Sequence, residues 1–296
     1  MYKRQAYLLS LLLLGLVLVV GQSGGGSQRW LNLGVFWFQP SELAKIGIVL
    51  AFARFFSNDK ESPPYTIKRL LVPGLLLLPC FVLIIFQPDL GTAGILALAA
   101  GSMIFFLRVH WKSILLVSLL GLMIVPVTYK FVLREYQRDR VKTFLDPGRD
   151  PRGSGYNAIQ CRIAVGSGKV SGKGYLKGTQ SLLNFIPEQH SDFIFSVFAE
   201  ERGFIGGTIL LILYFLYCFF SLQTVSRARA KFEMLLGFGL TAILFWHVFI
   251  NIGMVVGILP IVGVTLPFFS YGGTSLITFL VITALLLNLS RKRYIF

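Results

Sequence analysis

The chain has 296 residues, of which 55% are hydrophobic and 14% are charged, and its formal net charge is +15. Because a soluble domain usually carries about 25% charged residues, this composition excludes an ordinary soluble globular protein and indicates a polytopic membrane protein. The 3 cysteines and 3 histidines show no disulfide framework and no metal-ligand spacing.

Eight apolar stretches approach or exceed the roughly 17–25 residues that a helix needs to span a bilayer. They cover residues 5–21, 42–57, 70–86, 90–107, 113–129, 204–225, 232–258 and 266–289. The second stretch is the weakest, because it is short and contains Lys45 and Arg54. The predicted fold class is all-α: a polytopic membrane helix bundle of about eight spans with a large extracytoplasmic loop.

The cations of the short loops predict the orientation, since Lys and Arg accumulate on the cytoplasmic side. With both termini cytoplasmic, the short outer loops hold only Arg29, and the inner face holds Lys3, Arg4, Arg54, Lys60, Lys68, Arg69, Arg108, Lys112, Arg227, Arg229, Lys231, Arg291, Lys292 and Arg293. The chain then has three parts. These are residues 1–129 with five spans and an outer loop at 21–40, a basic extracytoplasmic loop at 130–191, and residues 192–296 with three spans and a broken outer loop at 258–275.

The first outer loop, residues 21–40, is rich in glycine and then in aromatic residues. Trp30 and Trp37 suit the depth of the lipid headgroups, so a hairpin at the membrane surface explains the aromatic residues. Arg29 is different, because it is the one cation of the short outer loops.

Residues 39–45 predict the start of a helix, because Pro40 is followed by Ser41 and Glu42. Glu42 and Lys45 are three residues apart, so they share a helical face and can pair. A lone charge at that depth costs about 2.5–3.5 kcal/mol on insertion scales. Two interpretations stay open, a structural ion pair and a polar cavity that binds an anion.

Asp89 stands between two apolar stretches and is three residues before Thr92. This spacing is typical of a helix cap, although it matches a capping box only in part. A role of Asp89 as a cap is compatible with a role in a polar site.

The outer segment at 130–191 carries a large excess of Lys and Arg, and residues 159–165 predict a short amphipathic or surface-lying helix. Residues 166–174 form a glycine-rich, cationic turn region that resembles a phosphate loop only superficially. The Walker pattern needs glycine where Ser167 stands and Ser or Thr where Gly174 stands, so this is not a nucleotide loop. Basic residues with free backbone N–H groups would still suit a lipid pyrophosphate. Nucleic acid is not expected as a partner on the outer face.

Residues 184–203 concentrate ionisable groups where the outer segment re-enters the membrane, and they include Glu188, His190 and Asp192. Such groups are costly at that boundary, which suggests chemistry. One interpretation makes Ser191 or Asp192 a helix cap. The other makes Asp192 a general base, a role that contributes about 10²–10⁴-fold in rate. Arg202 is expected to neutralise one of the two deeper carboxylates, Glu200 and Glu201.

The last outer loop combines Pro260 and Pro267 with the adjacent glycines Gly272 and Gly273. Prolines and glycines at membrane depth predict broken helices, which are tolerated where they are buried in protein or line a cavity. The pattern favours a polar cavity that opens to the outer leaflet over a simple bundle.

Six motifs together resemble the SEDS family (shape, elongation, division and sporulation), and their wording is closer to its RodA-like, rod-shape branch. They occupy residues 28–34, 38–45, 87–92, 172–181, 187–195 and 266–275, the last of which reads Leu-Pro-Phe-Phe-Ser-Tyr-Gly-Gly-Thr-Ser. The family normally has ten spans, and this chain begins at what would be the third, so two N-terminal helices are expected to be missing.

The resemblance implies a peptidoglycan glycosyltransferase that polymerises lipid II into glycan strands during cell elongation. It implies that Asp192 is the catalytic residue, and it gives as substrate-binding candidates Arg29, Glu42, Lys45, Asp89, Glu188 and His190. The implied partners are lipid II, the nascent glycan strand, a class B penicillin-binding transpeptidase and rod-complex proteins. No protein metal site is expected, although Mg²⁺ or Mn²⁺ near the pyrophosphate is compatible chemistry. A lipid II flippase or transporter of the same family is the alternative function. The enzyme is favoured because the polar motifs collect on the outer side.

Overall fold

The structure is a computed structural model of the chain. It describes residues 2–24, 27–32, 34, 37–59, 63–128, 130, 135–146, 148, 154–183, 185–186 and 188–291. Three of the cations used to predict the orientation lie outside the described residues, namely Lys60, Lys292 and Arg293.

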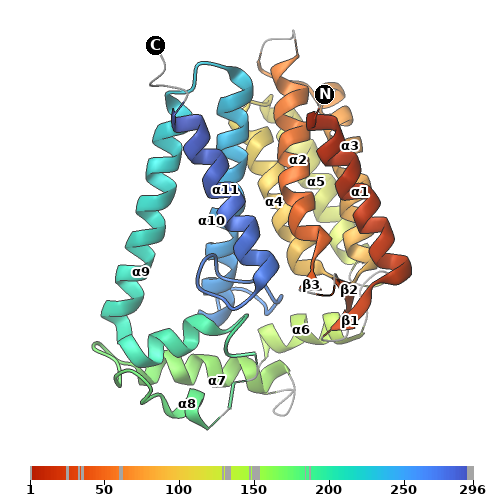
Figure 1. Cartoon of the computed structure of the whole chain (residues 1–296). Coiled ribbons are helices and arrows are strands. Elements are labelled where there is room, and N and C mark those ends of the chain that lie inside the picture. The colour runs from red at the N-terminus through yellow and green to blue at the C-terminus, as the bar shows by residue number, and fades with distance from the viewer. Residues whose placement is uncertain are drawn as a thin grey trace. The chain divides into compact units, whose positions relative to one another are not determined.

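Each of the eight predicted apolar stretches contains a long helix (Figure 1). The helices are α1 (Tyr2–Val20), α2 (Pro40–Ser57), α3 (Ile67–Phe86), α4 (Leu90–Phe106), α5 (Trp111–Val127), α9 (Ile194–Ser226), α10 (Lys231–Val256) and α11 (Gly273–Arg291). By length and composition, α3, α9, α10 and α11 are able to cross a membrane, and α1, α4 and α5 contain shorter apolar helices. The predicted start of the last stretch, at residue 266, is wrong, because Pro267 lies in a turn and α11 begins at Gly273.

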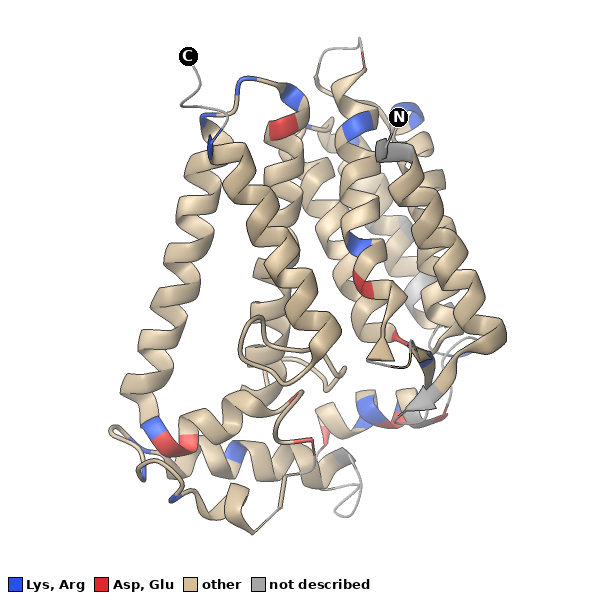
Figure 2. Ribbon diagram, viewed as in Figure 1, with Lys and Arg blue, Asp and Glu red and all other residues tan. Residues whose placement is uncertain are grey.

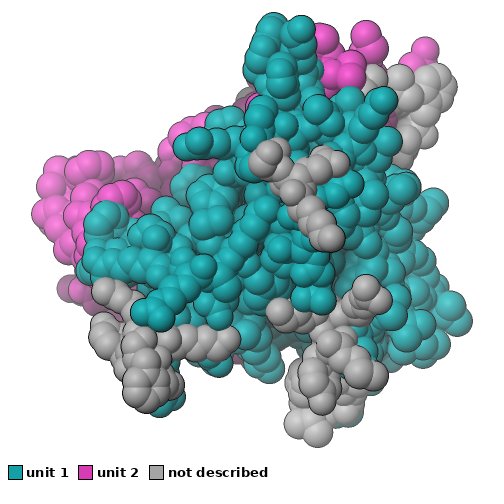
Figure 3. All heavy atoms as spheres, turned by 90° about the horizontal axis from the view of Figure 1, so that it is seen from above, with its two compact units in different colours: residues 1–113, 217–246, 272–296 teal, residues 114–216, 247–271 magenta. Residues whose placement is uncertain are grey.

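The chain divides into two compact units, coloured separately in Figure 3. The first unit comprises residues 1–113, 217–246 and 272–296, and the second comprises residues 114–216 and 247–271.

In the first unit, α2 packs against α1, α3 and α4 and also contacts α11. Its core contains the fully buried side chains of Phe52, Phe56 and Phe279. Small residues allow close packing, since a Cβ at Gly239 would lie 2.6 Å from Cγ1 of Val49. Apolar packing of this kind makes α2 an inner helix although it carries charges.

The predicted surface hairpin at residues 21–40 is present as a small antiparallel sheet. Its strands are β1 (Gln22–Gly24), β2 (Ser27–Asn32) and β3 (Trp37–Phe38), in the order β1-β2-β3. Leu31 pairs with Phe38 and Asn32 pairs with Trp37. The sheet is tied to α11 by a hydrogen bond of 2.7 Å from Thr274 Oγ1 to the Trp37 carbonyl.

In the second unit, three shorter helices lie between α5 and α9: α6 (Glu135–Leu145), α7 (Ser154–Ser167) and α8 (Thr179–Leu182). The predicted helix at 159–165 is confirmed as part of α7. Figure 2 shows that charged residues gather in this segment and at the ends of the long helices, whereas α2 carries charges within its length. Helix α9 is broken at Gly203, whose φ of 65° and ψ of −164° are not helical.

Candidate functional site

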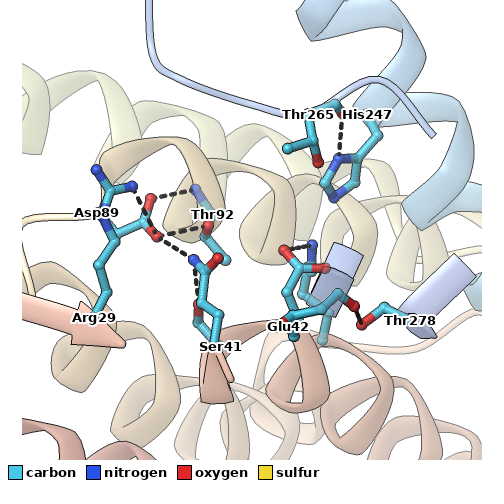
Figure 4. A network of polar contacts seen from close by, with 11 residues as sticks. Arg29, Ser41, Glu42, Asp89, Thr92, His247, Thr265 and Thr278 are labelled. Atoms are coloured by element: carbon cyan, nitrogen blue, oxygen red, sulfur yellow. Dashed lines mark hydrogen bonds and ion pairs between the residues drawn. The ribbon is translucent and has the colours of Figure 1, made fainter. Parts of the chain in front are cut away.

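Asp89 is the centre of a polar cluster in the first unit (Figure 4). Its Oδ1 accepts from the Thr92 backbone N–H at 3.1 Å, which confirms the predicted cap of α4. Its Oδ2 accepts from Thr92 Oγ1 at 2.8 Å and from Gln39 Nε2 at 3.1 Å, and Arg29 Nη1 lies 3.6 Å away. Asp89 is only 2% exposed, so these donors compensate a carboxylate that water hardly reaches.

Glu42 and Lys45 form the ion pair that their spacing on α2 predicts, with 2.7 Å between Lys45 Nζ and Glu42 Oε1. Lys45 is fully buried and Glu42 is 4% exposed. The second carboxylate oxygen of Glu42 is also buried and accepts no bond from the described residues. A buried carboxylate with one oxygen that accepts no hydrogen bond lowers the stability of the fold. Its role in substrate binding stays a prediction.

The turn that carries Asp192 is held by its main chain, within the second unit. The His190 carbonyl accepts from the Tyr271 N–H at 2.8 Å. The Ser191 carbonyl accepts from Ser270 Oγ at 2.6 Å, and the Asp192 carbonyl accepts from Asn251 Nδ2 at 2.9 Å. Each of these three consecutive carbonyls therefore accepts a hydrogen bond from α10 or from the loop that follows it.

The segment between α10 and α11 is non-helical, as its prolines predict, and it also shapes the space beside the Asp192 carboxylate. A Cβ atom at Gly263 would lie 3.1 Å from Asp192 Oδ2, and Gly263 has a φ of +70°. The positive φ favours glycine, and a Cβ atom at this position would also crowd the carboxylate. Asn251 Nδ2 also donates to the Val264 carbonyl at 2.6 Å, so one amide joins this segment to the Asp192 turn.

Glu188 and His190 are exposed in the same turn. The Glu188 carboxylate accepts from Ser191 Oγ at 3.0 Å, and its backbone has a φ of 52°, in the left-handed region. Helix α9 begins at Ile194, so Phe193 takes the flanking position at which a cap was predicted for Ser191 or Asp192. The turn is thus a separate, strained element that presents Asp192 outside the helix.

Glu200 makes a contact that the sequence analysis missed. Its Oε1 lies 2.7 Å from Lys173 Nζ, and it also accepts from Thr179 Oγ1 and the Gln180 N–H, both at 3.2 Å. The Glu200 side chain is fully buried, whereas that of Lys173 is 29% exposed. Lys173, which is 27 residues away, neutralises Glu200, so the neutralisation expected from Arg202 stays a prediction for Glu201.

The glycine-rich turn before α8 is hydrogen-bonded to the backbone around the break in α9. The N–H groups of Lys173 and Gly174 donate to the carbonyls of Glu200 and Glu201, each at 3.0 Å. In return the Phe204 N–H donates to the Lys169 carbonyl at 2.9 Å, which uses a donor freed by the break at Gly203.

This arrangement corrects the prediction of a turn whose N–H groups are available for pyrophosphate, because those of Lys173 and Gly174 are engaged within the chain. Glycine is required at the contact, since a Cβ at Gly172 would lie 2.1 Å from the Glu201 carbonyl oxygen. The turn therefore stabilises α9.

No group of three or more His, Cys, Asp or Glu residues that could hold a metal ion occurs among the described residues. Asn251 and Ser270, which anchor the Asp192 turn, were not among the predicted site residues. One signal was available: Asn251 is a polar residue inside the apolar stretch 232–258. It is fully buried, which its two bonds to carbonyls explain.

The chain matches one family model, described as "Cell cycle protein" and named for FtsW, RodA and SpoVE, over residues 1–295. Peptidoglycan glycosyltransferase MrdB of Escherichia coli (strain K12) is 46% identical over 271 residues, which are 92% of this chain and 73% of that protein. Stage V sporulation protein E of Bacillus subtilis (strain 168) is 35% identical over 286 residues, 96% of this chain and 77% of that protein.

Solved structures are similar along nearly the whole chain. One belongs to a peptidoglycan synthase complex described as coordinating polymerization and crosslinking, with a TM-score of 0.82 and 36% identity, covering 99% of this chain and 82% of that one. Another is the crystal structure of the Thermus thermophilus rod shape determining protein RodA, with a TM-score of 0.69 and 32% identity, covering 99% of this chain and 78% of that one.

Proposed function

This chain belongs to the FtsW/RodA/SpoVE family, and we propose that Asp192 is the general base with which it polymerises lipid II. The chain is a RodA-like peptidoglycan glycosyltransferase and a multi-pass protein of the inner membrane. The single observation that best supports Asp192 is its setting: three anchored carbonyls fix the turn, and the missing side chain of Gly263 leaves room at the carboxylate.

The proposed step transfers a glycan from its lipid carrier to an acceptor sugar. The acceptor hydroxyl oxygen bonds to the anomeric carbon of the donor while its proton moves to the Asp192 carboxylate. The bond between that carbon and the pyrophosphate oxygen breaks, and the electron pair leaves with the undecaprenyl pyrophosphate. A general base accelerates such a step only when it is held within hydrogen-bonding reach of the hydroxyl, which the anchored turn favours.

Arg29 and Lys45 are proposed as contacts for the pyrophosphate of the substrate. Arg29 lies on β2 and Lys45 lies on the largely apolar helix α2. Each cation pairs with a carboxylate, Arg29 with Asp89 and Lys45 with Glu42. Cations in sites of low water content stabilise the negative charge that develops on a pyrophosphate leaving group. Glu188 and His190 are proposed as contacts for the sugar hydroxyls, since both side chains are exposed.

A divalent cation is not assigned to protein ligands. Because Mg²⁺ usually keeps several water ligands and binds through one or two carboxylates plus phosphates, a bound ion would take most of its other ligands from the pyrophosphate. Asp89 and Glu42, two of the buried carboxylates of the first unit, already carry partners.

We also infer that both chain ends lie in the cytoplasm and that the partner is a class B penicillin-binding transpeptidase within a rod complex. The distribution of Lys and Arg supports the orientation. The similarity to a chain of a peptidoglycan synthase complex supports a transpeptidase partner.

The test is Asp192→Asn in the full chain, purified with a class B transpeptidase and supplied with fluorescent lipid II. We expect polymerisation to fall by about 10²–10⁴-fold with lipid II binding retained. The matched control is Asp139→Asn, because Asp139 is in the same unit and its Lys142 partner is on the surface of α6. Wild-type polymerisation by the Asp192 variant would show that another group takes the proton.

A further inference from the structure

A pocket of about 510 Å³ lies in the first unit, away from the polar clusters described above. It is formed by one end each of α1, α2 and α3 and by the residues after α2. Its lining consists of Tyr7, Leu8, Ala51, Arg54, Phe55, Asn58, Asp59, Arg69, Val72 and Leu76. This volume is within the range of small-ligand sites, about 300–1,000 Å³.

One end of the pocket is polar and carries a net positive charge. Arg69 holds the Asp59 carboxylate with two nitrogens, the Nε at 2.8 Å from Oδ2, so these two charges offset each other. The Arg69 guanidinium also lies 6.0 Å from the centre of the Phe55 ring. Arg54 remains as an exposed cation in the last turn of α2, with no side-chain partner among the described residues. The lining therefore favours an anion.

The rest of the lining is apolar and continues onto the outer faces of two helices. Leu8 on α1 is 55% exposed and Val72 on α3 is 44% exposed. The Tyr7 hydroxyl is not available to a ligand as a donor, because it donates to the Leu76 carbonyl at 2.9 Å. Ala51 contributes a small side chain to the wall. A ligand that fits this lining has an anionic head and an apolar tail.

The pocket lies at an end of the unit where further cations gather. Tyr65 connects three segments there: its N–H donates to the Arg108 carbonyl, and its hydroxyl accepts from Lys231 Nζ at 3.0 Å. Membrane surfaces rich in anionic lipids attract such basic ends, and basic pockets between membrane helices bind lipid head groups.

We propose that this pocket binds one anionic phospholipid from the leaflet at that end of the unit. Arg54 and Asn58 bind the phosphate, and one acyl chain lies against Leu8, Val72 and the other apolar side chains. The net charge of the lining selects an anionic lipid over a zwitterionic one. The site is independent of the Asp192 turn, since it is built wholly from α1 to α3.

The experiment is native mass spectrometry of the full purified chain, titrated separately with phosphatidylglycerol and phosphatidylcholine. We expect one lipid adduct that forms at about fivefold lower concentration with phosphatidylglycerol. Arg54→Gln should abolish that difference. Arg227→Gln is the matched control, because Arg227 is also an exposed arginine and lies outside the pocket lining, and it should preserve the difference.

Ala51→Phe separates the pocket from its charge. The larger side chain fills the apolar part and leaves Arg54 in place, so both lipids should lose the adduct while the melting temperature is unchanged. Equal binding of the two lipids by the wild type would overturn the proposal. The proposal would also be overturned if Arg54→Gln and Arg227→Gln showed the same preference between the two lipids, or if Ala51→Phe still formed the adduct. Polymerisation of lipid II is not the readout, so failure here leaves the assignment of Asp192 standing.

Discussion

Two carboxylates of the second unit, Asp192 and Glu200, are eight residues apart and have different environments. Glu200 is fully buried, and its Oε1 is bonded to Lys173, Thr179 and Gln180. Asp192 is half-buried, and its position is fixed through its own and neighbouring carbonyls. A carboxylate whose side chain holds the fold together serves structure. Asp192 is positioned through its main chain, which suits the role of general base proposed for it.

The difference has a consequence for mutation. Changes around Asp192 should reduce the rate and leave stability almost unchanged, whereas changes around Glu200 should reduce stability first. Variants around both carboxylates test this contrast, and the greatest loss of activity is expected at Asn251.

Asn251→Ala removes the amide that donates to both the Asp192 and the Val264 carbonyls. We expect kcat to fall by about a hundredfold, because a displacement near 1 Å of a catalytic group costs that much. The KM for lipid II should change little, since Asn251 is proposed to act through Asp192. Steady-state polymerisation measures both constants. Asn288→Ala, an exposed asparagine on α11, is the control; an equal loss in both variants would refute positioning by Asn251.

Gly263→Ala places a methyl group 3.1 Å from Asp192 Oδ2 and forces alanine to a φ of +70°. The backbone conformation alone costs about 1–2 kcal/mol, so the segment should shift and the rate should fall by roughly tenfold. Gly166→Ala is the control, because Gly166 is in the same unit within α7 and a Cβ there meets nothing within 4 Å. Full activity of the Gly263 variant would mean that the carboxylate does not need this space.

Lys173→Met leaves the buried Glu200 carboxylate without its cation. Since Lys173 is partly exposed, we expect a loss of about 2 kcal/mol, seen as a melting temperature lower by roughly 3–6 °C in detergent. Lys177→Met, an exposed lysine of the same loop, should melt like the wild type. The double variant Lys173→Met with Glu200→Gln should recover part of the loss, because no unpaired charge remains. A double variant less stable than either single one would contradict this account.

Cys161 is not expected to affect catalysis, and it tests how α7 packs. It lies in α7, outside the long apolar helices, and burial raises the pKa of its thiol from 9.0 to about 12. Because the thiolate is the reactive form, alkylation at pH 8 should be about a thousandfold slower than for an ordinary thiol. Iodoacetamide labelling of a Cys80→Ser, Cys218→Ser variant measures this, with the denatured protein as the fully labelled control. Rapid labelling of the folded variant would show that α7 is not packed as described.

Features that depend on residues close together in the chain can be predicted from the sequence alone. Apolar length predicts the eight helices, and helical spacing predicts the ion pair of Glu42 with Lys45. The distance of three residues from Asp89 to Thr92 predicts the cap of α4. These contacts follow from the fixed geometry of one helix or one turn, so the sequence is sufficient.

Contacts between groups far apart in the chain follow from the fold and could not be predicted from the sequence. Lys173, rather than the neighbouring Arg202, pairs with Glu200, and Asn251 fixes a carbonyl 59 residues away. The glycines of the cationic turn resembled a phosphate site but serve the break in α9. Such contacts depend on how segments pack, and many partners in the sequence satisfy the same charge or hydrogen-bonding rule. The physical reason is that a buried polar group requires a partner but does not specify, from its own position in the chain, which one it receives.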